Sequence, residues 1–240
     1  MLARAPRVLA VGEAHAQKGS EHVPSATRRF TESLLPRVQD LASDLVIEVV
    51  VAAGHCGRVE QRVSEKQRPV TKNQAPSAQN EFVTLAQRAK SLGIRPRPLL
   101  PTCEEYEAIA RSGSDDIHRM LELITRITTR EVSALLADQG RDAGRPSSSR
   151  KLVLTYGGAL HNDVSPRSGA ESWSFGPELT RRAEGAYIEL DLIVPEYVKD
   201  TEVWRALPWY PSFASAPQSS FARVFHTGPN SYVLVFPSSV

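Results

Sequence analysis

The chain has 240 residues, of which 41% are hydrophobic and 23% charged, a composition typical of a globular domain. Its net charge of +2 is too small for the concentrated basic face of a nucleic-acid-binding protein, so nucleic acid is not an expected partner. The sequence has no run of roughly 18 apolar residues, the length that a membrane-spanning segment needs.

Strands are predicted by six apolar runs, at residues 7–11, 45–51, 152–156, 186–194, 222–225 and 232–236. The first three are almost continuously apolar, which suits strands covered on both faces in a parallel sheet. The last two flank Gly228-Pro229-Asn230, a turn expected between antiparallel strands.

Helices are predicted by periodicity and cap signals at residues 25–41, 80–92, 102–110 and 114–138. Pro36 is expected to divide the first of them. Thr102 and Glu105 have the spacing of a capping box at the start of the third. Ser114 is expected to cap the longest helix, with Gly140 just beyond its end.

The remaining long stretches, residues 58–78 and 140–150, are polar and are expected to be irregular, the second as a flexible connection. Strands that alternate with helices predict an α/β fold. We expect a mostly parallel sheet flanked by helices, with an antiparallel C-terminal edge. The chain is predicted to form a single domain, residues 1–240, with possible halves at 1–140 and 150–240.

The cellular compartment and the state of the cysteines are linked questions. The N-terminal apolar run is too short for a signal peptide, so the chain as given is predicted to be cytoplasmic, or periplasmic or exported if a leader has been removed. Cys56 and Cys103 form no CxxC pair and indicate no zinc cluster, and a disulfide and two separate thiols both stay open. Cys56 follows His55, but adjacent side chains usually point apart, which makes an activated thiolate the weaker interpretation.

Two predicted strands end in the same way, in Gly-x-x-His. The first runs into Gly12 and His15, and the third runs into Gly158 and His161. Glycine is expected to permit a sharp turn at positive φ, which would place each histidine over the carboxyl end of the sheet. Ligands bind at those ends in open α/β sheets. On neighbouring strands, the two motifs would bring the histidines together.

Two glutamates complete the candidate site. Glu48 lies inside the apolar run 45–51, where a carboxylate is costly to bury unless it is paired, protonated or bound to a cation. With His15 and His161 it would form a two-histidine, one-carboxylate set that holds a divalent metal of unknown identity. Glu13 is a further ligand or the general base for a bound water. For Glu48, an ion pair with an arginine stays open as an alternative.

Further candidates flank these motifs. His55 lies seven residues beyond Glu48 and is a possible member of the same site. Asn162 and Asp163 directly follow His161, and either a supporting role in the site or a helix cap would account for them.

At these residues the chain resembles the superfamily that joins erythromycin esterase-like proteins, ChaN-like haem-binding lipoproteins and the TraB and Tiki proteins. The matching segments are GEAH at residues 12–15, Glu48 within VIEVV, and GGALH at residues 157–161. The resemblance implies an α/β fold built from two related halves. It covers short segments whose order spans about two thirds of the chain.

The branches of this superfamily imply different activities. The esterase-like and Tiki-like branches imply that Glu13, His15, Glu48 and His161 line an active site, for ester opening in the first and metal-dependent peptide cleavage in the second. The ChaN-like branch implies haem binding without turnover, here through Tyr156. We therefore expect a hydrolase of an ester or amide bond in a small molecule or peptide. A haem- or metal-binding protein and a catalytically degenerate domain stay open as alternatives.

Overall fold

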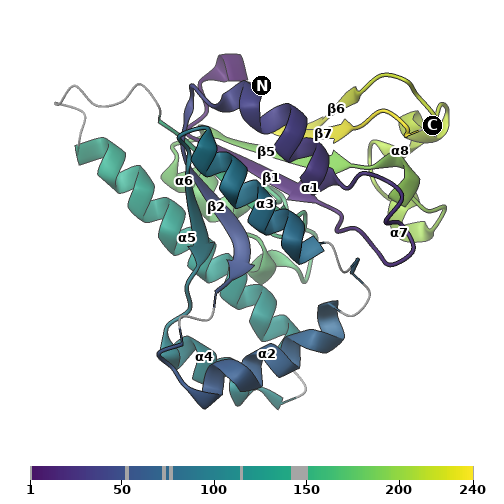
Figure 1. Cartoon of the computed structure of the whole chain (residues 1–240). Helices are drawn as coiled ribbons and strands as arrows, with labels where there is room; N and C mark the ends of the chain where they lie inside the picture. Colours follow the sequence, from purple (N-terminus) through teal and green to yellow (C-terminus); the bar gives the residue numbers. More distant parts are fainter. Residues whose placement is uncertain are drawn as a thin grey trace.

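A computed structural model describes residues 2–51, 54–71, 74–75, 78–113, 116–141 and 151–239. Within them, seven strands form one sheet in the order β3-β2-β4-β1-β5-β7-β6. All neighbouring strands are parallel except β7 and β6, which pair antiparallel at the edge. Helices lie on both sides of this sheet (Figure 1). The predicted α/β fold, mostly parallel with an antiparallel C-terminal edge, is confirmed.

The strands are β1 (Val8–Glu13), β2 (Ala42–Val50), β3 (Arg95–Leu99), β4 (Leu152–Gly158), β5 (Tyr187–Ile193), β6 (Arg223–Gly228) and β7 (Ser231–Val235). The α-helices are α1 (Ala26–Arg29), α2 (Arg58–Thr71), α3 (Ala78–Ser91), α4 (Cys103–Ala110), α5 (Asp116–Arg141), α6 (Gly176–Arg182), α7 (Glu202–Arg205) and α8 (Tyr210–Ala214). Short 3₁₀ helices are η1 (Leu2–Arg4), η3 (Leu35–Val38), η6 (Glu171–Trp173) and η7 (Pro195–Tyr197), and η2 (Phe30–Leu34) is a π-helical turn.

The sheet separates two hydrophobic layers because successive side chains of a buried strand point to opposite faces. In β1, Leu9 and Val11 pack in the layer that contains side chains of α1 and α3. Val8 and Ala10 pack in the other layer, with side chains of α2, α4, α5 and α6. Both faces of the central strands are therefore covered, which explains their nearly unbroken apolar sequences.

Six of the seven strands coincide with predicted runs, but β3 is missing from the prediction. Its sequence, RPRPL, contains Pro96 and Pro98, which lack a donor for a central ladder. The strand lies at the sheet edge and pairs with β2 alone, so this missing donor is tolerated. Arg95 and Arg97 from β3 hold the buried Asp44 of β2, at 2.9 and 3.0 Å.

The prediction that residues 58–78 are irregular is wrong, because residues 58–71 form α2. Val59 and Val63, one helical turn apart, are buried against the layer that includes α4. Most other side chains of this helix are polar, so its apolar stripe is too narrow to stand out in the sequence.

Most of the other helix predictions agree with the structure. The 25–41 segment does not form one continuous helix, as expected from Pro36: it consists of α1, η2 and η3. Thr102 and Glu105 form the predicted capping box. The longest helix, α5, runs through Gly140 to Arg141, so the predicted end before Gly140 is wrong. Ser114 and residues 142–150 lie outside the described residues.

Two further features bear on the compartment. Cys56 and Cys103 form a disulfide, a bond typical of oxidising environments. In the described part of the chain, no helix has the length and apolar character needed to cross a bilayer.

Candidate functional site

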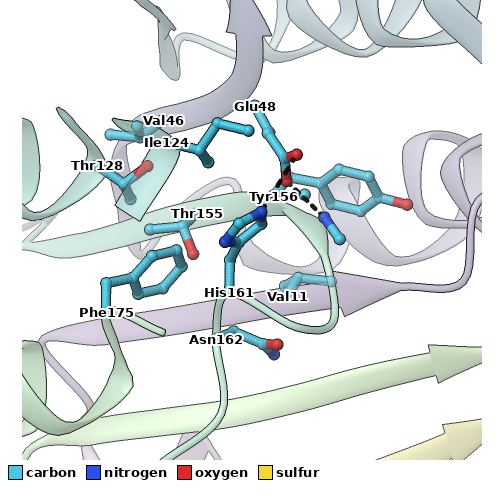
Figure 2. Close-up of a pocket in the computed structure, with 12 residues that line it drawn as sticks. Val11, Val46, Glu48, Ile124, Thr128, Thr155, Tyr156, His161, Asn162 and Phe175 are labelled. Carbon is cyan, nitrogen blue, oxygen red and sulfur yellow. Dashed lines mark hydrogen bonds and ion pairs between the residues drawn. The ribbon is translucent and has the colours of Figure 1, made fainter. Parts of the chain in front are cut away.

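The carboxyl ends of three adjacent strands bring the predicted residues together. Because β4 lies between β2 and β1, the loop that carries His161 emerges between Glu48 on β2 and Glu13 at the end of β1. Figure 2 shows Glu48 and His161 approaching each other, with Tyr156 beside them.

The first half of the site is a histidine–glutamate pair. His15 Nδ1 lies 2.8 Å from Glu13 Oε1. The other carboxylate oxygen of Glu13 accepts hydrogen bonds from Thr27 and Tyr156, each at 2.7 Å. Both oxygens of this buried carboxylate are thus engaged, and its contacts fix the orientation of the His15 ring.

The same contacts set the charge of His15. Burial by itself lowers the pKa of an imidazole, but the hydrogen bond and charge of Glu13, together with the charge of Glu48, raise the pKa of His15 to about 9. His15 is therefore an imidazolium at neutral pH, and both ring nitrogens carry hydrogen. Nδ1–H donates to Glu13, and Nε2–H stays available to another acceptor.

The second half of the site joins Glu48 to His161. Glu48 Oε2 accepts a 2.6 Å hydrogen bond from Gly158 N, and Oε1 lies 3.7 Å from His161 Nε2. His161 Nδ1 lies 2.6 Å from the Trp173 carbonyl oxygen, which can only accept, so we assign the hydrogen to Nδ1. The other ring nitrogen, Nε2, then faces Glu48. Within the described residues, the structure gives Glu48 no arginine partner.

The two halves start on opposite faces of the sheet and meet over the end of β4. Glu48 shares the face of Val46, whereas Glu13 shares the face of Val11. A methyl group added at Gly158 would lie 3.3 Å from His15 Nε2 and 3.7 Å from Glu48 Oε2. The imidazolium and the carboxylate therefore converge on the same small space beside this glycine.

The predicted reason for the glycines is wrong, because neither Gly12 nor Gly158 has a positive φ. Close approach is the actual reason. A Cβ on Gly12 would lie 2.6 Å from side-chain oxygens of Asn162 and Asp191, and one on Gly157 would collide with Glu48. Small residues let the side chains of neighbouring strands cross the end of the sheet.

A small cavity of about 10 Å³ lies against Glu48 and His161. This is close to the space that one water molecule needs. Two of its lining residues, Thr155 and Asn162, each have a buried side-chain oxygen with no hydrogen-bond partner among the described residues. Such groups favour an ordered water, which would lie beside Glu48 and His161.

The predicted metal set is not arranged as a metal centre. A tetrahedral ion holds its donor atoms roughly 3–4 Å apart. The ligand atoms of His15, Glu48 and His161 do not all lie within 4.8 Å of one another, since the described residues contain a single group that meets this limit, elsewhere in the fold. The divalent ion stays a prediction.

Three further candidates lie in other surroundings. Tyr156 is buried and donates its hydroxyl to Glu13, so haem binding through Tyr156, still a prediction, would require this bond to break. His55 is exposed beside the disulfide and does not line the cavity. Asp163 faces Glu189, whose charge adds to burial and raises the pKa of Asp163 to about 6.

Three residues that hold the site were not predicted from the sequence. Thr27 bonds Glu13, and Thr125 donates to the same Trp173 carbonyl oxygen that holds His161. A threonine or a backbone carbonyl carries no motif, so only the folded chain identifies them.

No family model and no curated protein matches the chain. Among solved structures, one titled "The structure of the type III effector HopBA1" is similar over 99% of this chain and 90% of that chain. The TM-score is 0.45 and the sequence identity 10%. A likeness this distant identifies no activity.

Proposed function

We propose that the protein is a hydrolase that cleaves an ester or amide bond by acid–base catalysis at the ends of β1, β2 and β4. One observation carries the proposal: the His15 imidazolium and the Glu48 carboxylate converge beside Gly158. A proton donor and a proton acceptor in one site are what the addition of water to a carbonyl requires. The resemblance to erythromycin esterase-like proteins implies the same class of reaction.

Each residue has a distinct role in this proposal. Glu48 removes a proton from the water as it attacks the carbonyl carbon, and His161, whose Nε2 lies 3.7 Å from Glu48 Oε1, positions this carboxylate and the water. His15 Nε2–H stabilises the developing oxyanion and then protonates the leaving group. Glu13 positions His15 and maintains its charge. This role replaces that of general base, because both oxygens of Glu13 are already hydrogen-bonded.

A panel of chromogenic substrates tests the proposal on the full chain. We would assay p-nitrophenyl esters, a lactone and a p-nitroanilide. Glu48→Gln and His15→Gln are each expected to lower kcat by about 10²–10⁴-fold, the usual contribution of a general acid or base. His161→Ala is expected to abolish turnover while the fold is retained, as judged by circular dichroism. His226→Ala, in an exposed position on β6, is the matched control and should have the wild-type rate.

The outcomes separate the alternatives. Equal rates in the wild type and Glu48→Gln would contradict the proposal, and no turnover on any substrate would favour a degenerate domain. A chelator should leave the rate unchanged, because no step passes through a metal.

The pH dependence is a second test. The proposed acid is protonated His15, whose pKa is raised to about 9. Activity, measured as kcat/KM, should therefore fall as the pH rises through about 9. This limb of the kcat/KM profile should move to lower pH in Glu13→Gln, which removes the charge that holds the proton. An unmoved limb would mean that another group supplies the proton.

The disulfide also supports a location. Disulfides persist in oxidising compartments, so we favour a periplasmic or exported protein over the predicted cytoplasmic one. Alkylation of free thiols in intact cells, followed by mass measurement, would show whether Cys56 and Cys103 are bonded in place.

A further inference from the structure

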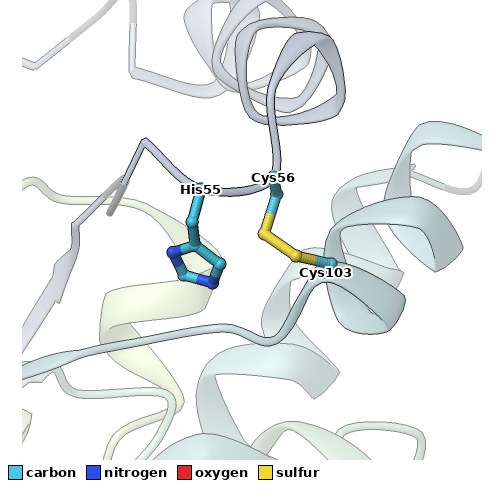
Figure 3. Close-up of side chains that lie close together, drawn as sticks. All are labelled: His55, Cys56 and Cys103. Carbon is cyan, nitrogen blue, oxygen red and sulfur yellow. A yellow bond between two sulfur atoms is a disulfide. The ribbon is translucent and has the colours of Figure 1, made fainter.

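Three metal-ligating side chains meet outside the lining of the cavity. The donor atoms of His55, Cys56 and Cys103 all lie within 4.8 Å of one another, and the two sulfurs are joined in a disulfide. Figure 3 shows the His55 ring beside the two sulfurs. One imidazole and two thiolates are a ligand set that zinc prefers, and they leave a fourth position for water.

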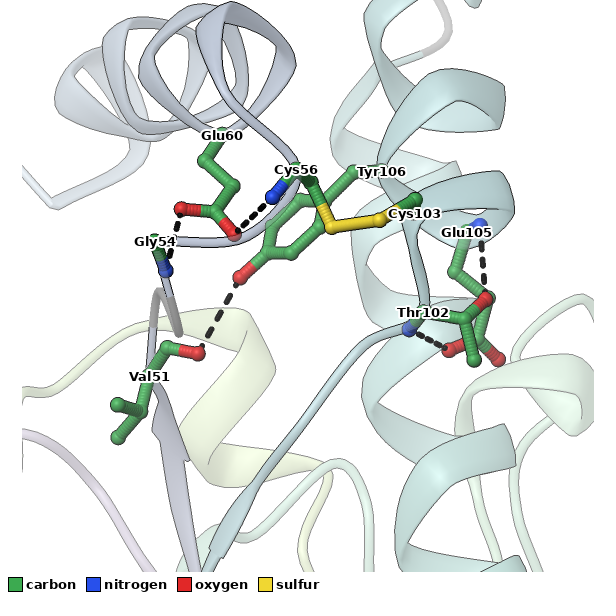
Figure 4. Close-up of a disulfide and its surroundings, with 8 residues drawn as sticks. All are labelled: Val51, Gly54, Cys56, Glu60, Thr102, Cys103, Glu105 and Tyr106. Carbon is green, nitrogen blue, oxygen red and sulfur yellow. Dashed lines mark hydrogen bonds between the residues drawn. A yellow bond between two sulfur atoms is a disulfide. The ribbon is translucent and has the colours of Figure 1, made fainter.

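The backbone around these residues is held by contacts other than the disulfide. The Glu60 carboxylate accepts hydrogen bonds from Gly54 N at 3.0 Å and from Cys56 N at 3.2 Å. Cys103 is the first residue of α4, directly after the capping residue Thr102 (Figure 4). Both cysteines therefore have a local anchor that does not depend on the bond between their sulfurs.

We propose that His55, Cys56 and Cys103 bind a zinc-like divalent ion when the disulfide is reduced. Cys56 and Cys103 would then be linked in either of two ways, by the disulfide or through a shared metal ion. The sequence hides this set, because the two cysteines are 47 residues apart and no CxxC pair is present.

A phosphine supplies the two electrons that convert the disulfide into metal-binding thiols. A phosphine and one water convert the disulfide into two thiols and a phosphine oxide, and the ion then displaces the two thiol protons. The positive end of α4 favours the thiolate at Cys103. The sulfurs must move from bonding distance to about 3.7 Å apart, as around a tetrahedral zinc ion. Gly54 and Gly57, at φ values of 76° and 64°, flank His55 and Cys56, the two ligands on this side of the disulfide that would shift.

Cobalt(II) is a suitable spectroscopic probe for the test. The full chain would be reduced anaerobically with a phosphine, freed of the phosphine and titrated with Co²⁺. We expect one ion per chain, with thiolate-to-cobalt absorption in the near ultraviolet and the visible bands of tetrahedral cobalt, both removed by added Zn²⁺. The oxidised chain should give neither signal. Bound Zn²⁺ should also slow the reaction of the two thiols with a disulfide reagent.

Variants assign the ligands. Cys56→Ser should lose at least half of the charge-transfer absorption, because only the Cys103 thiolate remains, and His55→Ala should bind cobalt at least tenfold more weakly, because it lacks the nitrogen ligand. His226→Ala is the matched control and should bind like the wild type, since it lies on β6. The proposal is overturned if the reduced wild type gives no thiolate absorption, or if His55→Ala binds as tightly as the control. Loss of the folded circular dichroism spectrum on reduction would also overturn it, because only the folded chain brings the three ligands together.

Discussion

Two clusters of carboxylates lie at the same end of the sheet, and their charges differ. On β1, Glu13 pairs with His15, which is an imidazolium at neutral pH. On the neighbouring β5, burial and then the charge of Glu189 raise the pKa of Asp191 to about 8, and the Asn162 amide offsets this only in part. Asp191 is therefore neutral at pH 7. A buried carboxylate beside a histidine can support charge and proton transfer, whereas one among other acids keeps its proton.

The largest effect should come from removing the acceptor on β1. Glu13→Ala leaves His15, Thr27 and Tyr156 without their shared partner, and breaking such a buried pair costs about 3–5 kcal/mol of unfolding free energy. Urea denaturation measures this loss. Glu13→Gln keeps an acceptor oxygen and should lose less. A loss in Glu13→Ala below about 1 kcal/mol would mean that the pair does not stabilise the fold.

An intermediate effect is expected on β5, and it depends on pH. The folded chain keeps the Asp191 proton up to pH about 8, whereas the unfolded chain releases it near pH 4, so the wild type loses stability as the pH rises through this window. Asp191→Asn has no proton to lose. Its stability relative to the wild type should therefore increase from pH 5 to pH 8, by on the order of 3 kcal/mol. Equal differences at both pH values in urea denaturation would contradict a neutral Asp191.

The smallest effect on stability, with a clear effect on activity, is expected where the two halves of the site meet. Gly158→Ala places a methyl group 3.3 Å from His15 Nε2 without a positive-φ penalty, so the unfolding free energy should change by less than about 1 kcal/mol. The methyl group fills the space between acid and base, and hydrolysis of a responsive ester should fall at least tenfold. Gly157→Ala collides with Glu48 and should impair both properties more. Unchanged hydrolysis in Gly158→Ala would place the reaction elsewhere.

Much of the fold follows from the sequence, and the exceptions have physical causes. Continuous apolar runs identify the buried strands, because a side chain covered on both faces of a sheet has no polar alternative. The edge strand β3 was not predicted because it has no apolar run. Its prolines and arginines suit a strand with a single neighbour. Helix α2 was not predicted because, among its residues of described burial, Val59 and Val63 are the only buried apolar ones.

The candidate site could be predicted as a set of residues but not as a geometry. Repeated Gly-x-x-His motifs placed His15 and His161 near Glu48, and the structure brings them to adjacent strand ends. The sequence does not indicate that Glu13 pairs with His15 while Glu48 pairs with His161. That division depends on which face of its strand each residue occupies. It also depends on the hydrogen bond that Thr27 donates to Glu13 and on the one that the Trp173 carbonyl oxygen accepts from His161.

The central position of β4 has a consequence for synthesis of the chain. Its two neighbours, β1 and β2, emerge from the ribosome about 140 and about 100 residues before it, and in the native sheet they do not pair with each other. Until β4 inserts, both strands expose unpaired backbone groups, and the contacts that complete them are distant in sequence, a feature of slow folding. A nascent or truncated chain that ends before residue 150 would therefore aggregate readily, and the candidate site would be completed only in the last stage of folding.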